Sequence, residues 1–319
     1  TSNAFTGAMT ITTNDASGTD ADVTIDGGTT ALNIGASTID GDLTVTSDNA
    51  SGITDSGTVT VGGNLIATTD ANNGVIDLGT TTVTGTMDLT SHGSGNVMID
   101  NANADIVLIA SEIGGTLTLT TGAGTGITDA AGQAVTVGGN LVATTDANNG
   151  VINLGTTTVT GTMDLTTEGT GNVTIDNATT DIVLIASEVG GDLTLTTGNA
   201  SGIIDSGTVT VGGNLVATTD ANSGVINLGT MAVDGTFTLS PNSTGAVTVV
   251  NDAGLNFAAS TVTGALSATA TTGDITDSGA LTITGAATFI TGATGSNIVL
   301  DTSSNAFSNS VEVRADDGS

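Results

Sequence analysis

The segment Val59-Thr60-Val61-Gly62-Gly63-Asn64-Leu65 returns at residues 135–141 and again at residues 209–215. The two intervals between successive copies are nearly equal. Before the two glycines, apolar residues alternate with Thr, which is the period of a strand that buries one face. A segment of this kind that recurs at a nearly fixed interval predicts a stack of similar structural units.

A shorter element lies inside each long repeat, as in the segment Val83-Thr84-Gly85-Thr86-Met87-Asp88-Leu89. It has an apolar residue two positions before a glycine and two more apolar residues after it. Its copies are centred on the glycines at 41, 63, 85, 115, 139, 161, 191, 213, 235, 264 and 285. We interpret each copy as one coil of a β-solenoid, in which strands of successive coils pair in parallel at roughly 4.8 Å.

This spacing predicts an all-β parallel β-helix with about 13 coils of 21–30 residues, and with three coils in each repeat of about 74 residues. We expect residues 1–319 to form a single continuous solenoid. Its long repeats span approximately residues 53–126, 127–202 and 203–274, with partial repeats at both ends.

The alternation also predicts which side chains face the core. In the short element, Val83, Met87 and Leu89 are expected to point inward and the Thr and Asp residues between them outward. The same reasoning, applied to residues 182–185 and their counterparts at 255–258 and 32–35, places every second residue outside. Four apolar side chains are then exposed and form a candidate lateral contact: Val107, Ile109, Val183 and Ile185.

Composition excludes several classes of partner. The chain has 32 acidic residues and 1 basic residue, so that its net charge of −31 repels nucleic acid and anionic lipid surfaces. It contains no Cys and therefore no disulfide. No apolar run approaches the roughly 18 residues of a membrane span, and membrane insertion is not expected.

The two ends of the sequence resemble each other. The segment Ser2-Asn3-Ala4-Phe5 matches residues 304–307, and Met9 and Ile11 align with apolar residues that follow the second copy. Neither end has the polar cap that a free-standing solenoid needs. We therefore expect the terminal coils, around Phe5 and Phe307, to stack end to end on other copies.

Several elements carry a family resemblance, among them Gly191-Asp192-Leu193-Thr194-Leu195-Thr196 and residues 274–279 and 305–311. They resemble the repeats of filamentous-haemagglutinin-like exoproteins and of large bacterial β-strand-repeat surface proteins. The resemblance covers essentially the whole chain. It implies a right-handed parallel β-helix, export to the cell surface, and a role in adhesion, matrix or fibre formation.

The sequence offers little for catalysis, because there is no Cys and His92 is the only His. Aligning the coils at the glycine elements predicts one corner occupied by Asp70, His92, Gly122, Asp146, Glu168, Gly198, Asp220 and Asn242. Asp146 and Glu168 would then lie one coil apart, roughly 5 Å, which suits the carboxylate pair of a retaining glycosidase. Such sites usually also need aromatic platforms, and this chain has no Trp or Tyr and only five Phe, so we expect no enzyme.

Calcium is the most credible ligand, because it prefers carboxylate, carbonyl and amide oxygens. Its candidate ligands are Asp70, Asp146, Glu168 and Asp220, although the copies of the Asp70 turn are too far apart to share an ion. No cofactor is otherwise expected.

These observations predict a structural protein of an extracellular bacterial fibre or surface matrix, which associates with itself end to end, laterally, or in both ways. Its partners would be further copies or repeats of the same chain, or the cell surface and its glycans. The alternative is a spacer stalk in a giant adhesin. More remote alternatives are a polysaccharide-acting β-helix enzyme and an ice-binding solenoid with arrays of Thr.

Overall fold

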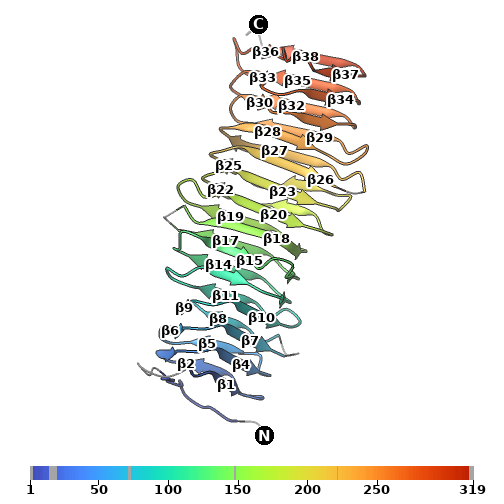
Figure 1. The fold of residues 1–319 in the computed structure, drawn as a ribbon. Coiled ribbons are helices and arrows are strands. Elements are labelled where there is room, and N and C mark those ends of the chain that lie inside the picture. The colour runs from blue at the N-terminus through green and yellow to red at the C-terminus, as the bar shows by residue number, and fades with distance from the viewer. Residues whose placement is uncertain (1–2, 14–19, 71–72, 147–148, 221, 316–319) are drawn as a thin grey trace. The chain divides into compact units, whose positions relative to one another are not determined.

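Short parallel strands joined by turns make up the protein, and the computed structural model describes residues 3–13, 20–70, 73–146, 149–220 and 222–315 (Figure 1). These residues contain 38 strands and no helix, so no helix in the described ranges could cross a membrane. The strands stack as a parallel β-solenoid of about 13 turns, which confirms the predicted fold class. The chain divides into two compact units, Thr1–Gly161 and Thr162–Ser319.

The first unit has strands β1 to β18. Their bounds are Val23–Asp26, Leu32–Ile34, Ser37–Ile39, Leu43–Ser47, Ile53–Asp55, Val59–Val61, Leu65–Thr69, Ile76–Leu78, Thr81–Val83, Met87–Ser91, Val97–Asp100, Ile106–Leu108, Ser111–Ile113, Leu117–Thr121, Gly126–Asp129, Val135–Val137, Leu141–Thr145 and Val151–Val159. One sheet runs β1-β4-β7-β10-β12-β15-β18, a second runs β2-β5-β8-β11-β14-β17, and a small third runs β3-β6-β9. Strand β13 joins β10 to β16, which pairs with β18.

The second unit has strands β19 to β38. Their bounds are Met163–Thr167, Val173–Asn177, Ile182–Leu184, Ser187–Val189, Leu193–Thr197, Ile203–Asp205, Val209–Val211, Leu215–Thr219, Ile226–Val233, Thr236–Ser240, Val247–Asn251, Leu255–Phe257, Ser260–Val262, Leu266–Ala270, Ile275–Asp277, Leu281–Ile283, Ala287–Thr291, Ile298–Val299, Ala306–Phe307 and Val311–Ala315. One sheet runs β20-β23-β26-β28-β30-β33-β36 and another β19-β21-β24-β27-β29-β32-β35-β38, beside the short β31-β34-β37. Strand β22 pairs with β19 and β25, and β25 pairs with β27.

The core is a set of apolar ladders, because parallel pairing in register places inward side chains directly over one another. Leu43 pairs with Leu65, and Leu65 pairs with Met87. All three side chains are buried. Along each of their strands, the residues that alternate with the buried ones face outward. The corners leave no room for side chains: a Cβ on Gly85 would lie 2.5 Å from the carbonyl oxygen of Gly63 in the coil before. Glycine is therefore required where coils approach so closely.

Coil length is more uniform than the glycine spacing suggested. Between described residues, a short step joins Val247 to Leu266, and long steps join Ile127 to Ile152 and Thr12 to Thr38. The step from Leu43 to Leu65 is typical, and the coils are roughly 22 residues long. The prediction of coils as long as the interval from Gly85 to Gly115 is therefore wrong, although the shorter glycine spacings are close to the true coil length.

One long repeat is also not a whole number of coils, which corrects the prediction of three coils per repeat. Starting from Leu65, the paired positions in its sheet reach Asp129 after three coils. The repeat places the counterpart of Leu65 at Leu141, which lies further along the chain, in β17 of the other large sheet. In the second unit, Leu193 of β23 and its counterpart Leu266 of β32 likewise lie in different sheets. Equivalent elements of successive long repeats therefore lie in different sheets.

A buried asparagine marks each of these steps. Asn101 has no exposed surface. It takes the place of a strand beside β9, because the N–H of Val83 donates to its Oδ1 at 2.7 Å and its Nδ2 donates to the carbonyl of Val83 at 3.0 Å. Asn251 does the same for Val233 in the second unit, with distances of 2.9 and 3.0 Å. Asn177, also fully buried, lies between these two at the spacing of the long repeat.

Candidate interaction surfaces

The carboxylates proposed for calcium lie on turns that follow strands of the solenoid. Asp70 follows β7 and Asp146 follows β17 in the first unit, and Glu168 follows β19 and Asp220 follows β26 in the second unit. All four are exposed. Within the described ranges, no group of three or more His, Cys, Asp or Glu side chains is placed to hold a metal ion.

The predicted single corner is wrong within the first unit. Asp70 and His92 do occupy successive coils, because they follow the paired strands β7 and β10. Gly122 and Asp146, in contrast, follow β14 and β17, which pair with each other in the other large sheet. The physical reason is that one long repeat is not a whole number of coils, so that the repeating element passes to a neighbouring sheet between these two pairs.

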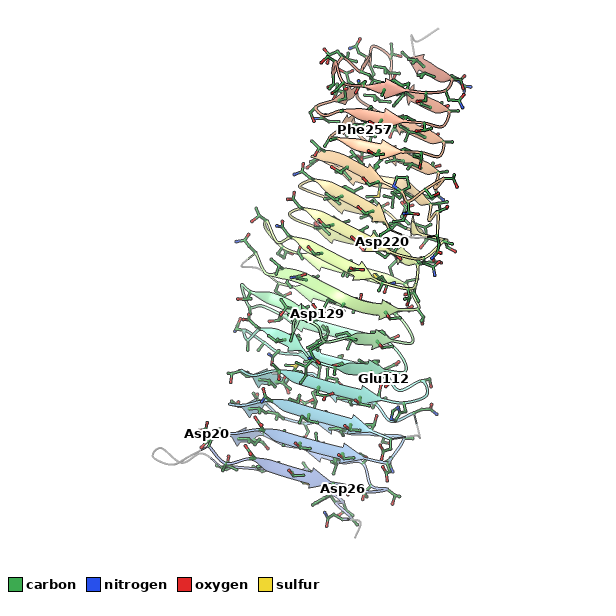
Figure 2. All side chains as sticks on the ribbon, turned by 45° about the vertical axis from the view of Figure 1, so that its right-hand side comes forward. Asp20, Asp26, Glu112, Asp129, Asp220 and Phe257 are labelled. Atoms are coloured by element: carbon green, nitrogen blue, oxygen red, sulfur yellow. The ribbon has the colours of Figure 1, made fainter. Side chains whose placement is uncertain are left out.

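A column of aspartates runs along the first sheet of the first unit. The carboxyl of Asp48 has a raised pKa, first because its side chain is hydrogen-bonded to that of Asp70 in the next coil, and then because of burial and the charges of Asp70 and Asp26. The charges of the neighbouring carboxylates disfavour the ionised form of Asp48. Figure 2 shows how acidic side chains such as Asp26 project outward from the ribbon.

Other acidic groups respond to burial. Burial raises the pKa of Asp88 and of Asp164, which project from β10 and β19. Burial also raises the pKa of Asp176, with a second contribution from the charge of Asp220. These strand carboxylates are thus partly removed from water, and ionising them costs free energy.

A second set of aspartates serves the structure itself. In the repeated Ile-x-Asp motif, Asp55 accepts the N–H of Gly79 at 3.1 Å and of Thr80 at 3.0 Å, one coil later. Asp205 does the same for Gly229 and Thr230, at 2.7 and 2.6 Å. The signal for this role was present in the sequence, since a Gly-Thr pair follows each of these aspartates at the same interval.

Asp277 is a further member of this set, and its pKa is lowered. Burial alone would raise its pKa, but hydrogen bonds from the side chains of Asn305 and Thr302 and from the backbone of Asp301 and Thr302 lower it. The donor from Asn305 Nδ2 lies 2.6 Å from Oδ2. The charged form of Asp277 therefore stabilises the fold.

The predicted lateral residues face outward, but they are half-buried. Val107 lies on β12 in the first unit and is paired with Thr128, a polar residue. Val183 lies on β21 and is paired with Ile204, which makes a larger apolar area in the second unit. Ile109 and Ile185 follow these strands and are also half-buried.

Two other outward apolar side chains, which the sequence analysis did not predict, are more exposed than the four lateral residues. They are Ile66 on β7 and Met98 on β11, at 36% and 41% of their surface. Both have polar neighbours on the strands with which they pair. Ile66 is paired with Asp88, and Met98 is paired with Asp77. An apolar residue in an otherwise polar outward column was the signal available in the sequence.

The strand at the C-terminal edge exposes core positions. On β38, Val311 and Val313 are paired with Ala287 and Phe289, whose side chains are buried. The two valines nevertheless expose 42% and 55% of their surface, because no further described strand covers them. The two valines therefore occupy positions on β38 that are equivalent to core-facing positions of β35.

Four phenylalanines follow one another in the second unit up to this edge. The ring centroids of Phe237 and Phe257 are 6.4 Å apart, those of Phe257 and Phe289 are 6.2 Å apart, and those of Phe289 and Phe307 are 6.1 Å apart. The last two contacts are edge-to-face, a favourable geometry for aromatic pairs. Phe307 is the half-buried end of this series, and Phe5 is half-buried in the first unit.

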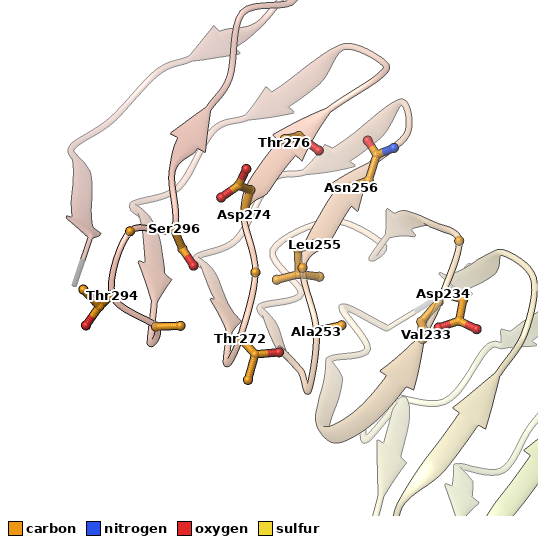
Figure 3. A pocket seen from close by; sticks show the side chains of 15 residues that line it. Val233, Asp234, Ala253, Leu255, Asn256, Thr272, Asp274, Thr276, Thr294 and Ser296 are labelled. Carbon is orange, nitrogen blue, oxygen red and sulfur yellow. The ribbon is translucent and has the colours of Figure 1, made fainter. Parts of the chain in front are cut away.

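A groove on the second unit is lined mainly by polar groups (Figure 3). Asp234, Asn256 and Asp274 contribute side chains to it. Asp274 is already engaged, because its Oδ1 accepts the N–H of Asn297 at 2.6 Å. With no aromatic or cationic side chain in its lining, the groove lacks the usual features of a sugar or anion site.

Comparison with known proteins gives one family. A family model described as "Repeats of unknown function (DUF5649)" matches residues 20–76, 170–226 and 244–314, which together make up more than half of the chain. The second and third matches are offset from each other by one long repeat, and the first and second by two. No curated protein and no solved structure matches.

Proposed function

Because the chain belongs to the DUF5649 family of repeats, whose function is unknown, we propose from its own surfaces that it is a structural protein of an extracellular bacterial fibre or surface matrix. In this proposal its main partners are further copies or repeats of the same chain. It associates end to end through its terminal coils and side by side through its outward apolar residues. The proposal assigns no catalytic role and no obligatory cofactor.

The observation that carries this proposal is that Val311 and Val313 of β38 occupy core-facing positions but are exposed. Apolar side chains in core positions are stabilised when a further strand covers them, by roughly 25 cal/mol for each Å² removed from water. An unpaired strand edge also offers backbone donors and acceptors to another strand. A coil of the same fold supplies both the ladder and the apolar partners that Val311, Val313 and Phe307 require.

Charge and composition support a location outside the cell. A net charge of −31 keeps a repetitive, strand-rich chain soluble, and cations in the medium then set how closely copies approach. The absence of Cys fits a fold whose stability comes from the stacked ladders. A spacer stalk of a giant adhesin is the second candidate, since the same exposed edge is satisfied when the next coil belongs to the same chain.

Filament formation by the purified chain tests the proposal. We expect electron microscopy to show filaments, and the variant Val313→Asp to lose them while its circular dichroism stays unchanged. Thr282→Asp, an exposed outward position of β34, is the matched control because it adds the same charge away from the edge. Filaments in Val313→Asp would place the end contact elsewhere. A wild-type chain that stays monomeric would refute self-association and favour the stalk.

A further inference from the structure

Two turns of the first unit combine an exposed asparagine with a glycine. Asn73-Gly74 follows β7 and Asn149-Gly150 follows β17, and these are the two Asn-Gly pairs in the chain. Both asparagines are exposed and have left-handed backbones, with φ of 57° and 60°. The third copy of this turn, in the second unit, has Ser223 before Gly224, with φ of 59°. The residue before this glycine is therefore left-handed in all three copies, whether it is Asn or Ser.

The glycine of each pair is fixed by its surroundings. A Cβ on Gly74 would lie 2.6 Å from the carbonyl oxygen of Asn49, and one on Gly150 would lie 2.6 Å from that of Ala123. The glycine carbonyls also accept hydroxyl hydrogen bonds at 2.8 Å, from Thr69 and Thr145. Each asparagine is thus followed by a backbone nitrogen that no side chain shields.

The side-chain amide of Asn73 is also held by a donor. Its Oδ1 accepts the N–H of Ser94, in the next coil, at 2.8 Å. A hydrogen bond to an amide oxygen withdraws electrons from the carbonyl carbon, which makes Cγ a better electrophile. An electrophilic carbon and an unshielded nucleophile therefore lie on adjacent residues.

We propose that Asn73 and Asn149 are sites of spontaneous deamidation. The nitrogen of the following glycine attacks Cγ, a Cγ–N bond forms, and the Cγ–Nδ2 bond breaks. The proton from the glycine nitrogen leaves with the ammonia. Water then opens the five-membered succinimide at either carbonyl, and gives Asp or isoaspartate. The reaction needs no enzyme, oxidant or cofactor.

Each conversion changes the surface of the fold. It adds one negative charge to a turn that already contains Asp70 or Asp146. The isoaspartate product also lengthens the main chain by one carbon directly before a glycine that has no spare room. Deamidation would thus accumulate with time in two of the three equivalent turns, while the turn with Ser223 lacks the reacting Asn-Gly pair.

Other asparagines are protected by their environment. Asn101, Asn177 and Asn251 are fully buried. Their amide groups are engaged by backbone donors or acceptors on neighbouring segments. They are followed by Ala or Asp, whose side chains shield the attacking nitrogen.

Mass spectrometry of the full-length chain tests the proposal. After weeks in mildly alkaline buffer, peptides from a protease that cleaves at Asp should show the amide-to-acid mass increase at Asn73 and Asn149. Peptides with Asn101, Asn177 or Asn251 should not. The variant Asn73→Ser copies the natural third turn and should halve the acid gained per chain.

A denatured sample, incubated in parallel, is the control for the chemistry. If it converts at these two positions and the folded chain does not, the turns protect the asparagines and the proposal is wrong. The proposal is also wrong if conversion in the folded chain is spread evenly over exposed asparagines. Neither result depends on whether the chain forms filaments.

Discussion

Asn101 is polar, fully buried and placed where a strand is missing from the ladder. Its amide supplies one acceptor and one donor in the spacing that a strand backbone would provide to Val83. Its Nδ2 also reaches the carbonyl of Asp105 at 2.8 Å. No apolar residue of similar size can satisfy these groups, because buried backbone N–H and C=O groups need partners.

We therefore expect Asn101→Leu to lower the free energy of unfolding by roughly 2–4 kcal/mol, since it leaves buried backbone groups of Val83 without partners. Asn103→Leu is the matched control, because Asn103 is exposed, and its effect should be within about 0.5 kcal/mol. Chemical denaturation followed by circular dichroism measures both. Equal losses would show that the amide does not replace a strand.

Asp277 and Asp88 should respond to acid in opposite ways. The pKa of Asp277 is lowered from 3.8, so its contribution to stability is complete above that value and is lost as the pH falls through the lowered pKa. The pKa of Asp88 is raised from 3.8 by burial, so stability is gained as the pH falls through its raised pKa.

Asp277→Asn should therefore flatten the loss of stability below about pH 4, whereas Asp88→Asn should stabilise the chain at neutral pH and remove a gain on mild acidification. Thermal melts at a series of pH values check both variants. An acid limb in Asp277→Asn as steep as that of the wild type would contradict the assignment.

At the scale of strands, alternation predicted the inward faces correctly. Leu89, Leu119, Leu165, Leu195 and Leu239 all have no exposed surface. This success has a simple cause, because a strand allows only two side-chain directions. The long interval between Gly85 and Gly115 was misread as one coil, since spacing alone does not say which sheet an element joins.

The hydrogen bonds of Asn101 and of the motif aspartates depend on that register and were not predicted, although the interval between each aspartate and its Gly-Thr pair was a signal in the sequence. Their partners, such as Val83 and Gly79, become neighbours only when the coil length is known. The lateral residues were predicted to face outward and do so. The shared corner was wrong because it inherited the error in coil length.

Adjacent residues of β19 test the face assignment directly. Leu165→Asp places a carboxylate in the core without a partner and should cost at least about 3 kcal/mol. Asp164→Leu removes an outward carboxylate whose pKa is raised by burial, so it should change stability by no more than about 0.5 kcal/mol. Melting temperatures of the two variants provide the comparison. Similar losses would mean that the faces are reversed.

At the scale of the whole molecule, charge governs association. At a net charge of −31 two copies repel each other, and salt at roughly 0.15 M shortens the range of this repulsion to about 8 Å. Lateral contact is then favoured only where the surface is apolar. Val107, Ile109, Val183 and Ile185 are the proposed positions.

Changing these four residues to Thr should abolish lateral bundling and leave each copy folded, because Thr keeps the β-branch and its strand preference. Added salt or calcium should promote bundling of the wild type and have much less effect on the variant. Light scattering with electron microscopy distinguishes bundles from single filaments. Ile66→Thr together with Met98→Thr is the companion variant, and loss of bundling there alone would locate the contact on β7 and β11.

The mismatch between repeat and coil has a consequence for inheritance. Nearly identical repeats in a gene recombine, and such events delete or duplicate whole repeats. Removal of a single coil would return every later strand to the same sheet. Removal of one long repeat would instead transfer each later strand to a neighbouring sheet, with the core register kept. Variation in copy number would therefore turn the downstream surface toward a new side, and change which neighbours it meets, without a single amino-acid substitution.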